Sequence, residues 1–192
     1  MYQIRNGWIV FNNEFNGSLS NVVFPMGIQK VKFNWYFNQD MRNLPNNLTH
    51  LIFGGDFNQD VSNLPNSLTH LTFGYHFNQE MHNLPNSLTY LTFGYHFNQD
   101  VSNLPNSLTH LTFSHYFNQD VSQLPKSITY LKFYDWNYFK FNHNLNPYLY
   151  HLTEFNIKDT HKHKSLMLSR CRVNRHNISI REDKLIDLLL KN

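Results

Sequence analysis

The chain repeats itself with a period of about 20 residues over most of its 192-residue length. Residues 57–73 are identical to residues 97–113, and a Phe-Asn pair opens each copy. These pairs begin at Phe37, Phe57, Phe77, Phe97 and Phe117. A fixed period of this size is typical of proteins in which similar units stack side by side. The sequence therefore predicts a solenoid to which each unit contributes one coil.

Within one unit, apolar and polar residues alternate only over a short run. Leu71 and Phe73 are apolar, whereas His70, which precedes Leu71, and Thr72, which lies between the two, are polar. This alternation predicts a short strand with one buried face. The rest of the unit is rich in Asn, Gln, Asp, Ser and Pro, which favour turns. The whole chain contains no alanine, so strong helix formers are scarce. We expect a mostly β fold with short parallel strands.

The unit Leu-Pro-x-Ser-Leu-Thr-x-Leu-x-Phe-Gly, followed by Phe-Asn-Gln, resembles the FNIP repeat, a relative of the leucine-rich repeat. One copy carries the resemblance at Leu64, Pro65, Ser67, Leu68, Thr69, Leu71, Phe73, Gly74, Phe77, Asn78 and Gln79. The resemblance implies a leucine-rich-repeat-like solenoid that acts in protein interactions. The family occurs chiefly in amoebae and the large DNA viruses that infect them. The N-terminus shows no basic stretch followed by an apolar run of signal-peptide length, so we expect an intracellular, cytoplasmic location, which for a viral protein is the host cytoplasm.

These observations divide the chain into four predicted parts. Residues 1–14 form a lead-in or cap, and residues 15–156 form about seven coils of 20–22 residues. Residues 157–178 form a basic linker, and residues 179–192 form a helix that begins at the capping box Ser179-x-x-Glu182. The helix is expected to cap the open end of the solenoid, and the alternative is a docking helix for a partner or a second copy. We expect the coils to wind in the right-handed sense.

One file of side chains points away from the predicted core at the start of each strand. Its members are either His or Tyr, and Thr follows two residues later in three of the coils. The residues of this candidate partner-binding face are His50, His70, Thr72, Tyr90, Thr92, His110, Thr112 and Tyr130. Tyrosine is enriched in protein interfaces, so the file suits a protein partner. The alternative is that these side chains only pack against each other across neighbouring strands.

Two further files recur with the same spacing. An asparagine follows each opening Phe, at Asn38, Asn58, Asn78, Asn98 and Asn118. These amides are expected to form a structural ladder that satisfies backbone groups of adjacent coils, and the alternative is a ligand-binding row. An acidic file follows at Asp40, Asp60, Glu80, Asp100 and Asp120. Because like charges repel, it is expected on an exposed turn, where a cation or a basic partner is the alternative use.

No metal, cofactor or catalytic site is expected. His76 and His96 form a weaker file with no third ligand at a matching position. The tail residues His161, His163 and Cys171 fit no standard zinc spacing together with His176. The single cysteine excludes an intramolecular disulfide, and no catalytic motif is present. No apolar stretch is long enough to span a membrane. We therefore expect a protein that is not an enzyme.

The charge of the chain is uneven. The net charge of +3 divides into −2 for residues 1–157 and +5 for residues 158–192. The basic tail raises the alternative of nucleic-acid binding through residues 158–181, which would make binding steeply salt-dependent. A substrate-adaptor role in ubiquitin ligation is a further alternative, although residues 1–14 are too short for an F-box of their own. Self-association through the open sheet ends is also compatible with the pattern. The preferred hypothesis is a non-catalytic scaffold that binds an unidentified protein partner across the exposed strand face.

Overall fold

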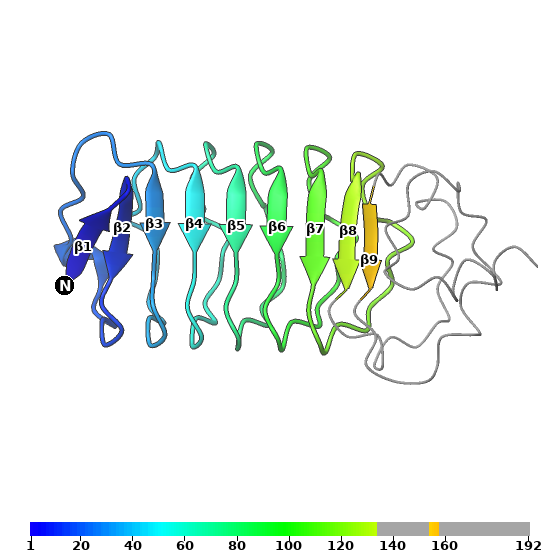
Figure 1. Cartoon of the computed structure of the whole chain (residues 1–192), viewed down its shortest axis with the longest axis horizontal. Helices are drawn as coiled ribbons and strands as arrows, with labels where there is room; N and C mark the ends of the chain where they lie inside the picture. Colours follow the sequence, from blue (N-terminus) through cyan, green and yellow to red (C-terminus); the bar gives the residue numbers. More distant parts are fainter. Residues whose placement is uncertain (134–153, 158–192) are drawn as a thin grey trace, which may run out of the picture.

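The computed structural model describes residues 1–133 and the backbone of residues 154–157. The described strands form one nine-stranded sheet in which they lie in chain order (Figure 1). They are β1 (Tyr2–Arg5), β2 (Trp8–Phe11), β3 (Lys30–Lys32), β4 (His50–Ile52), β5 (His70–Thr72), β6 (Tyr90–Thr92), β7 (His110–Phe113), β8 (Tyr130–Phe133) and β9 (Glu154–Ile157). β1 and β2 are antiparallel, and all later neighbours are parallel.

The strands lie where the alternation predicts them, and they are in register one repeat apart. Leu71 of β5 pairs with Leu51 of β4 and Leu91 of β6, and all three are almost fully buried. The chain bends at Pro65, whose carbonyl accepts a hydrogen bond from the backbone N–H of Leu68. The prediction of a mostly β solenoid with short parallel strands is confirmed.

The described residues complete about six turns, fewer than the seven coils that the sequence analysis predicts. Trp8 of β2 pairs with Lys30 of β3. From Lys30 onward, the corresponding paired residue recurs at a constant interval along the chain as far as Tyr130 of β8. Only β9 of the seventh expected coil is described, because residues 134–153 lie outside the described part. The basic linker and the C-terminal helix expected at 179–192 also lie outside the described residues.

The core is a pair of phenylalanine columns beside a column of leucines. Within one coil the rings of Phe53 and Phe57 stack with their centroids 3.7 Å apart. Between coils, the ring of Phe57 lies 6.0 Å from that of Phe77, again nearly parallel. Among the described residues, no polar or charged side chain is buried. The core is therefore held by dispersion and the hydrophobic effect, and polar groups are satisfied nearer the surface.

Hydrogen bonds from three polar positions join each coil to the one before it. The backbone N–H of Asn78 donates to the side-chain Oδ1 of Asn58 at 2.9 Å, and the hydroxyl of Ser87 donates to the carbonyl of Leu68 at 2.6 Å. The hydroxyl of Thr69 donates to the carbonyl of Thr49 at 3.0 Å. Because the same bonds recur from coil to coil, the repetition of these Asn, Ser and Thr residues is explained by the hydrogen bonds that join neighbouring coils.

One corner of the coil brings two backbones unusually close together. A Cβ atom at Gly74 would overlap the carbonyl oxygen of Gly54, and a Cβ at Gly94 would overlap that of Gly74. Glycine at this position therefore allows neighbouring coils to approach each other at the end of the strand.

The first fourteen residues form a hairpin, which the sequence analysis does not predict. Asn6 and Gly7 connect β1 to β2, and both have positive φ angles, 49° and 77°. Two such residues form the tight turn that joins antiparallel strands, and Asn-Gly is its strongest sequence signal. The expectation of a lead-in or cap for residues 1–14 did not take this Asn-Gly turn signal into account. The hairpin extends the sheet by an antiparallel edge strand at its N-terminal end.

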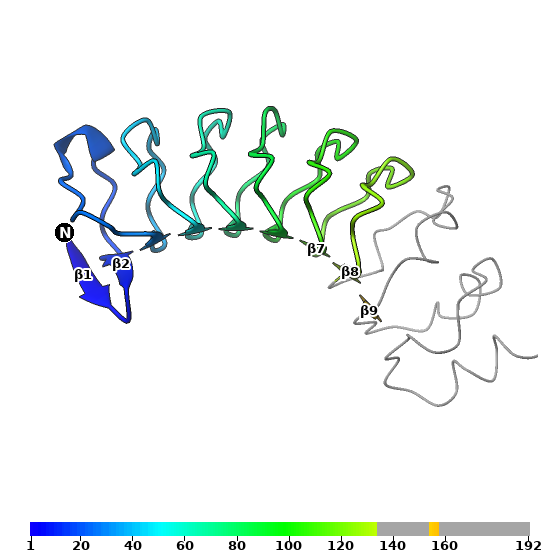
Figure 2. The same ribbon diagram turned by 90° about the horizontal axis from the view of Figure 1, so that it is seen from above.

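The solenoid is curved, and its strands line the concave side. Figure 2 shows the strands on the inside of an arc and the connecting turns on the outside. Paired strands lie about 4.8 Å apart, whereas the phenylalanine rings of successive coils lie 5.8–6.1 Å apart in β4–β6. The wide rings of the core thus hold the outer side of the coils further apart than hydrogen bonding holds the inner side.

Candidate functional site

The candidate site is the concave face of strands β4 to β8. The first residue of each of these strands points away from the core, and the parallel register places these residues in one column. The column contains His50, His70, Tyr90, His110 and Tyr130. All five side chains are partly exposed, and Tyr90 is the most open at 40%.

The rings of this column stack on each other. The centroids of His50 and His70 lie 4.1 Å apart, those of His70 and Tyr90 lie 4.3 Å apart, and the ring planes are within 10° of parallel. The stack continues from Tyr90 to His110 at 4.1 Å and from there to Tyr130 at 5.3 Å. From His50 to His110 these separations are shorter than the 5.8–6.1 Å between core phenylalanines of successive coils in the same region, and the column lies on the inside of the curve. The result is a pre-organised aromatic ridge.

A threonine fixes the protonation pattern of each histidine in the ridge. The hydroxyl of Thr69 donates its one proton to the carbonyl of Thr49, and the same Oγ1 lies 2.9 Å from Nδ1 of His70. With the hydroxyl donating to that carbonyl, Oγ1 can accept from Nδ1–H, and in that tautomer Nε2 of the neutral ring is a hydrogen-bond acceptor. His50 and His110 make the same contact with the threonine that precedes each of them.

The electrostatic surroundings favour neutral imidazoles. Burial lowers the pKa of His50, and the nearby charge of Lys30 lowers it further. Burial also lowers the pKa of His70, and the charges of the neighbouring histidines and of Lys30 act in the same direction. At neutral pH the ridge thus offers uncharged rings and acceptor nitrogens.

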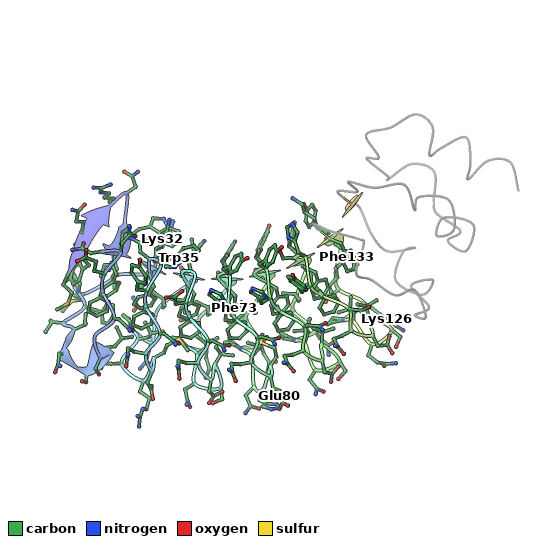
Figure 3. The ribbon with its side chains drawn as sticks, turned by 90° about the horizontal axis from the view of Figure 1, so that it is seen from below. Lys32, Trp35, Phe73, Glu80, Lys126 and Phe133 are labelled. Carbon is green, nitrogen blue, oxygen red and sulfur yellow. The ribbon has the colours of Figure 1, made fainter. Side chains whose placement is uncertain are left out.

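The charged residues of the described solenoid are divided between its two sides. Lys30, Lys32 and Lys132 are strand residues whose side chains lie on the concave face, while strands β3 to β8 contain no carboxylate. The acidic file lies on the exposed outer turns, as the sequence analysis predicts. There Asp60 accepts hydrogen bonds from the backbone and hydroxyl of Ser62. Figure 3 shows Lys32 on the inner side and Glu80 on the outer side.

Four overlapping stretches of the chain match the FNIP Repeat family, at residues 40–76, 57–96, 77–113 and 97–135. Together these stretches cover half of the sequence. The chain belongs to the FNIP repeat family. Its resemblance to that family, first indicated by the repeated unit, is thereby confirmed.

A solved structure shares this fold. The FNIP-repeat chain is 38% identical to CroV588, described as a novel circular LRR protein structure, with a TM-score of 0.64. The match covers 78% of this chain and 26% of that one, so this chain spans about a quarter of the length of CroV588. No curated protein matches the sequence.

The eight residues of the predicted partner-binding face lie together on the concave side. Thr72, Thr92 and Thr112 form a second column beside the ridge, aligned by the same register. Ile52 and Lys132 continue this column at its two ends. The geometry gives this FNIP-repeat chain one continuous surface, and its use by a partner stays a prediction.

The asparagine file lies elsewhere, on half-buried positions of the coil. The side-chain oxygen of each asparagine accepts a hydrogen bond from the backbone N–H of the next asparagine along the solenoid, at 2.7–3.0 Å from Asn38 to Asn118. The same chain of bonds begins one coil earlier, at Asn16. A group engaged in this way joins coils, which is the structural use that the sequence analysis prefers.

A second aromatic column runs along the edge of the concave face, and the sequence analysis missed it. Its rings belong to Trp35, Tyr75, Tyr95 and His115. The signal was present in the repeat, because an aromatic residue follows the position of Gly74 in four coils. Gly55 interrupts the series, and the change from Trp to Tyr to His obscures it.

Metal-binding clusters and membrane-spanning helices are not found among the described residues. These residues contain no group of three or more His, Cys, Asp or Glu side chains that could hold a metal ion. In the same part of the chain, no helix has the length and apolar character needed to cross a membrane. The tail residues His161, His163, Cys171 and His176 lie outside it.

Proposed function

We propose that this FNIP-repeat chain is a non-catalytic scaffold that binds a protein partner across the concave face of strands β4 to β8. The observation that carries the proposal is the stacked ridge of partly exposed His and Tyr rings, flanked by the threonine column. Rings fixed by their neighbours lose little conformational entropy when a partner covers them. Tyrosines of this kind are frequent anchors of protein interfaces.

The chemistry of the face supports a partner of a particular type. At neutral pH the imidazole Nε2 atoms accept hydrogen bonds, the threonine column is polar but uncharged, and lysines lie toward both ends. A complementary surface would present hydrogen-bond donors opposite the ridge and acidic groups opposite the lysines. The repeat family and the solenoid fold support the scaffold class, and the face itself supports the choice of surface.

The test removes the ridge without touching the core. The triple variant His70→Ala, Tyr90→Ala, His110→Ala is compared with the wild-type chain in affinity capture from cell lysate. The captured protein is then purified and titrated against both. We expect at least a tenfold loss of affinity, about 1.4 kcal/mol or more.

The matched control places three alanines on exposed outer turns, at Asn66, Asn86 and Asn106. This control should bind as the wild type does, and both triple variants should keep the β circular dichroism spectrum. Equal binding by the ridge variant would show that the proposed face is wrong. Capture that depends on residues 158–181 and disappears after nuclease treatment would instead favour the nucleic-acid alternative.

A further inference from the structure

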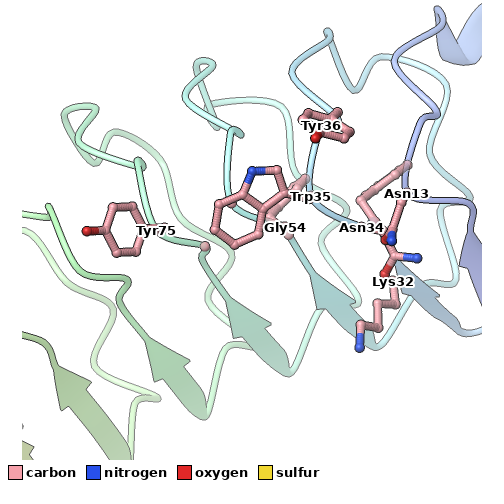
Figure 4. Close-up of a pocket in the computed structure, with 11 residues that line it drawn as sticks. Asn13, Lys32, Asn34, Trp35, Tyr36, Gly54 and Tyr75 are labelled. Atoms are coloured by element: carbon pink, nitrogen blue, oxygen red, sulfur yellow. The ribbon is translucent and has the colours of Figure 1, made fainter.

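A hollow of about 580 Å³ opens beside strands β3 to β5, at the edge of the concave face (Figure 4). Three of its lining residues are Gly54, Gly55 and Gly74, and its aromatic walls are Trp35, Tyr36 and Tyr75. The hollow lies where the second aromatic column lacks a ring, because Gly55 stands in place of Tyr or His. It is separate from the ridge, none of whose rings lines it.

Trp35 is held flat over the missing ring position. A Cβ atom at Gly55 would lie 2.6 Å from both Cδ2 and Cε2, the two atoms shared by the rings of the indole. Only an approach to the ring face reaches both atoms, so the indole rests on the backbone of Gly55. Trp35 is nevertheless 49% exposed. One face of the indole is thus supported by the backbone, while much of the side chain stays open to solvent.

Tyr75 continues this platform. Its ring centroid lies 6.3 Å from that of Trp35, the two planes are inclined by 33°, and 39% of Tyr75 is exposed. Tyr75 is itself supported by Tyr95, whose ring stacks on it at 4.6 Å. Two apolar rings are therefore presented side by side in fixed positions.

Two polar side chains of the hollow act only as hydrogen-bond donors, whereas those of Asn13, Asn34, Tyr36 and Tyr75 can donate and accept. The indole N–H of Trp35 and the ammonium group of Lys32 can only donate, and the lining contains no carboxylate. The carbonyls of Trp35 and Gly55 already accept hydrogen bonds from the backbones of Asp56 and His76, both at 2.8 Å. A ligand that combines apolar rings with hydrogen-bond acceptors would therefore complement the aromatic walls together with the donors of Trp35 and Lys32.

We propose that this hollow binds a proline-rich segment of a protein partner in the polyproline II conformation. Proline supplies an apolar ring and a carbonyl acceptor but has no backbone N–H. Such segments dock on aromatic grooves in other proteins and lose little entropy because their conformation is preformed. A peptide added as a β-strand would need a free sheet edge, whereas β3, β4 and β5 each have neighbours on both sides.

The test uses the full chain and a fluorescein-labelled decaproline peptide, with binding followed by fluorescence anisotropy. We expect saturable binding that Trp35→Ala weakens about tenfold or more. Gly55→Ala should also weaken decaproline binding, because the new Cβ displaces the indole of Trp35 from its position over Gly55 without removing the ring. Tyr116→Ala is the matched control, since it removes an exposed ring of the same edge that does not line the hollow. A Gly-Ser peptide of equal length should not compete.

Absence of decaproline binding up to about 1 mM, or equal binding by the wild type and both hollow variants, would overturn the proposal. Saturable binding of a neutral oligosaccharide such as cellohexaose, without binding of decaproline, would assign the platform to sugar rings and also overturn it. If Trp35→Ala fails to fold, Gly55→Ala still decides the question, because its new Cβ has only the exposed indole as its nearest neighbours.

This inference rests on the proposed function, but the two can fail separately. The ridge variant described above should bind decaproline like the wild type. If decaproline fails to bind while that variant still loses its captured partner, the hollow is wrong and the concave scaffold stands. If decaproline binds at the hollow and the ridge variant keeps its partner, the hollow stands and the ridge is wrong.

Discussion

The histidines of the ridge are held in place by contacts with several neighbouring residues. Each is fixed on one side by the preceding threonine and on its two faces by neighbouring rings. This arrangement gives a defined tautomer and places an acceptor nitrogen at a known position. It also makes protonation unfavourable, because His50 and His70 lie close to each other and to Lys30.

Stability should therefore fall as the pH falls through the histidine range. Burial and neighbouring positive charge lower the pKa of His50 and His70 below the usual value of about 6.5. Above that pH neither state is protonated and the stability is fully present. As the pH falls from about 6.5 toward the lower folded pKa, the unfolded chain binds protons that the folded chain resists, so unfolding becomes easier.

Thermal unfolding measured between pH 7.5 and 5 checks this prediction. The Tm of the wild type should fall over this range. The variant His50→Gln, His70→Gln should show a shallower fall, because glutamine stays neutral throughout. Parallel curves for the two proteins would show that these imidazoles do not resist protonation in the folded state. The lowered pKa of Asp60 and Asp100 acts in a separate window, below the usual pKa of a carboxyl group.

At the scale of the coil, stability lies in the joints between neighbours. A three-residue strand buries too little to stand alone, and each coil gains a paired strand on both sides together with asparagine, serine and threonine bonds. The asparagine joint is clearest to isolate at Asn78, whose Oδ1 accepts from the backbone N–H of Asn98. The leucines and phenylalanines contribute burial, but their removal would also leave cavities and so mix two effects.

Asn78→Ala should destabilise the chain by about 1–3 kcal/mol. The substitution leaves the backbone N–H of Asn98 without the Oδ1 acceptor that it contacts at 2.8 Å. Chemical denaturation followed by circular dichroism measures the change. Asn66→Ala is the matched control, because this asparagine lies on an exposed turn and should cost less than about 0.5 kcal/mol. A similar loss in both variants would show that the ladder is not a special joint.

At the scale of the whole molecule, curvature follows from three spacings. The rings of the ridge stack at 4.1–4.3 Å from His50 to His110, paired strands lie about 4.8 Å apart, and the core phenylalanines repeat at about 6 Å. The spacing grows from the concave face toward the outside. An arc is the shape that satisfies all three at once, and it turns the candidate partner-binding face inward.

Because coils contact mainly their neighbours, one whole coil should be removable. Deleting residues 77–96 joins His76 to Phe97, which restores the His-Phe pair found at 96–97 and keeps the register of the repeat. We expect a folded protein with the same spectrum and a Tm lowered by no more than about 10 °C. Deleting residues 77–86 removes half a coil and should abolish the cooperative transition. An equal loss in both deletions would show that stability is not a sum over neighbouring coils.

The sequence by itself determined the repeat, the positions of the repeated strands β4 to β8 and which of their side chains point inward. These features depend on local alternation and on a period that every coil shares. It also placed the His and Tyr file on one face, because a strand has only two faces. The hairpin at Asn6-Gly7 was within its reach, since the signal is local.

Tertiary structure alone decided the curvature, the stacking of the ridge and the seat of Trp35 on Gly55. Each depends on distances between side chains that belong to different coils. Such distances are set by the balance between paired strands and stacked core rings, which no single coil contains. The hollow beside Trp35 is the clearest example, because a missing side chain in one coil becomes a feature only when its neighbours are in place.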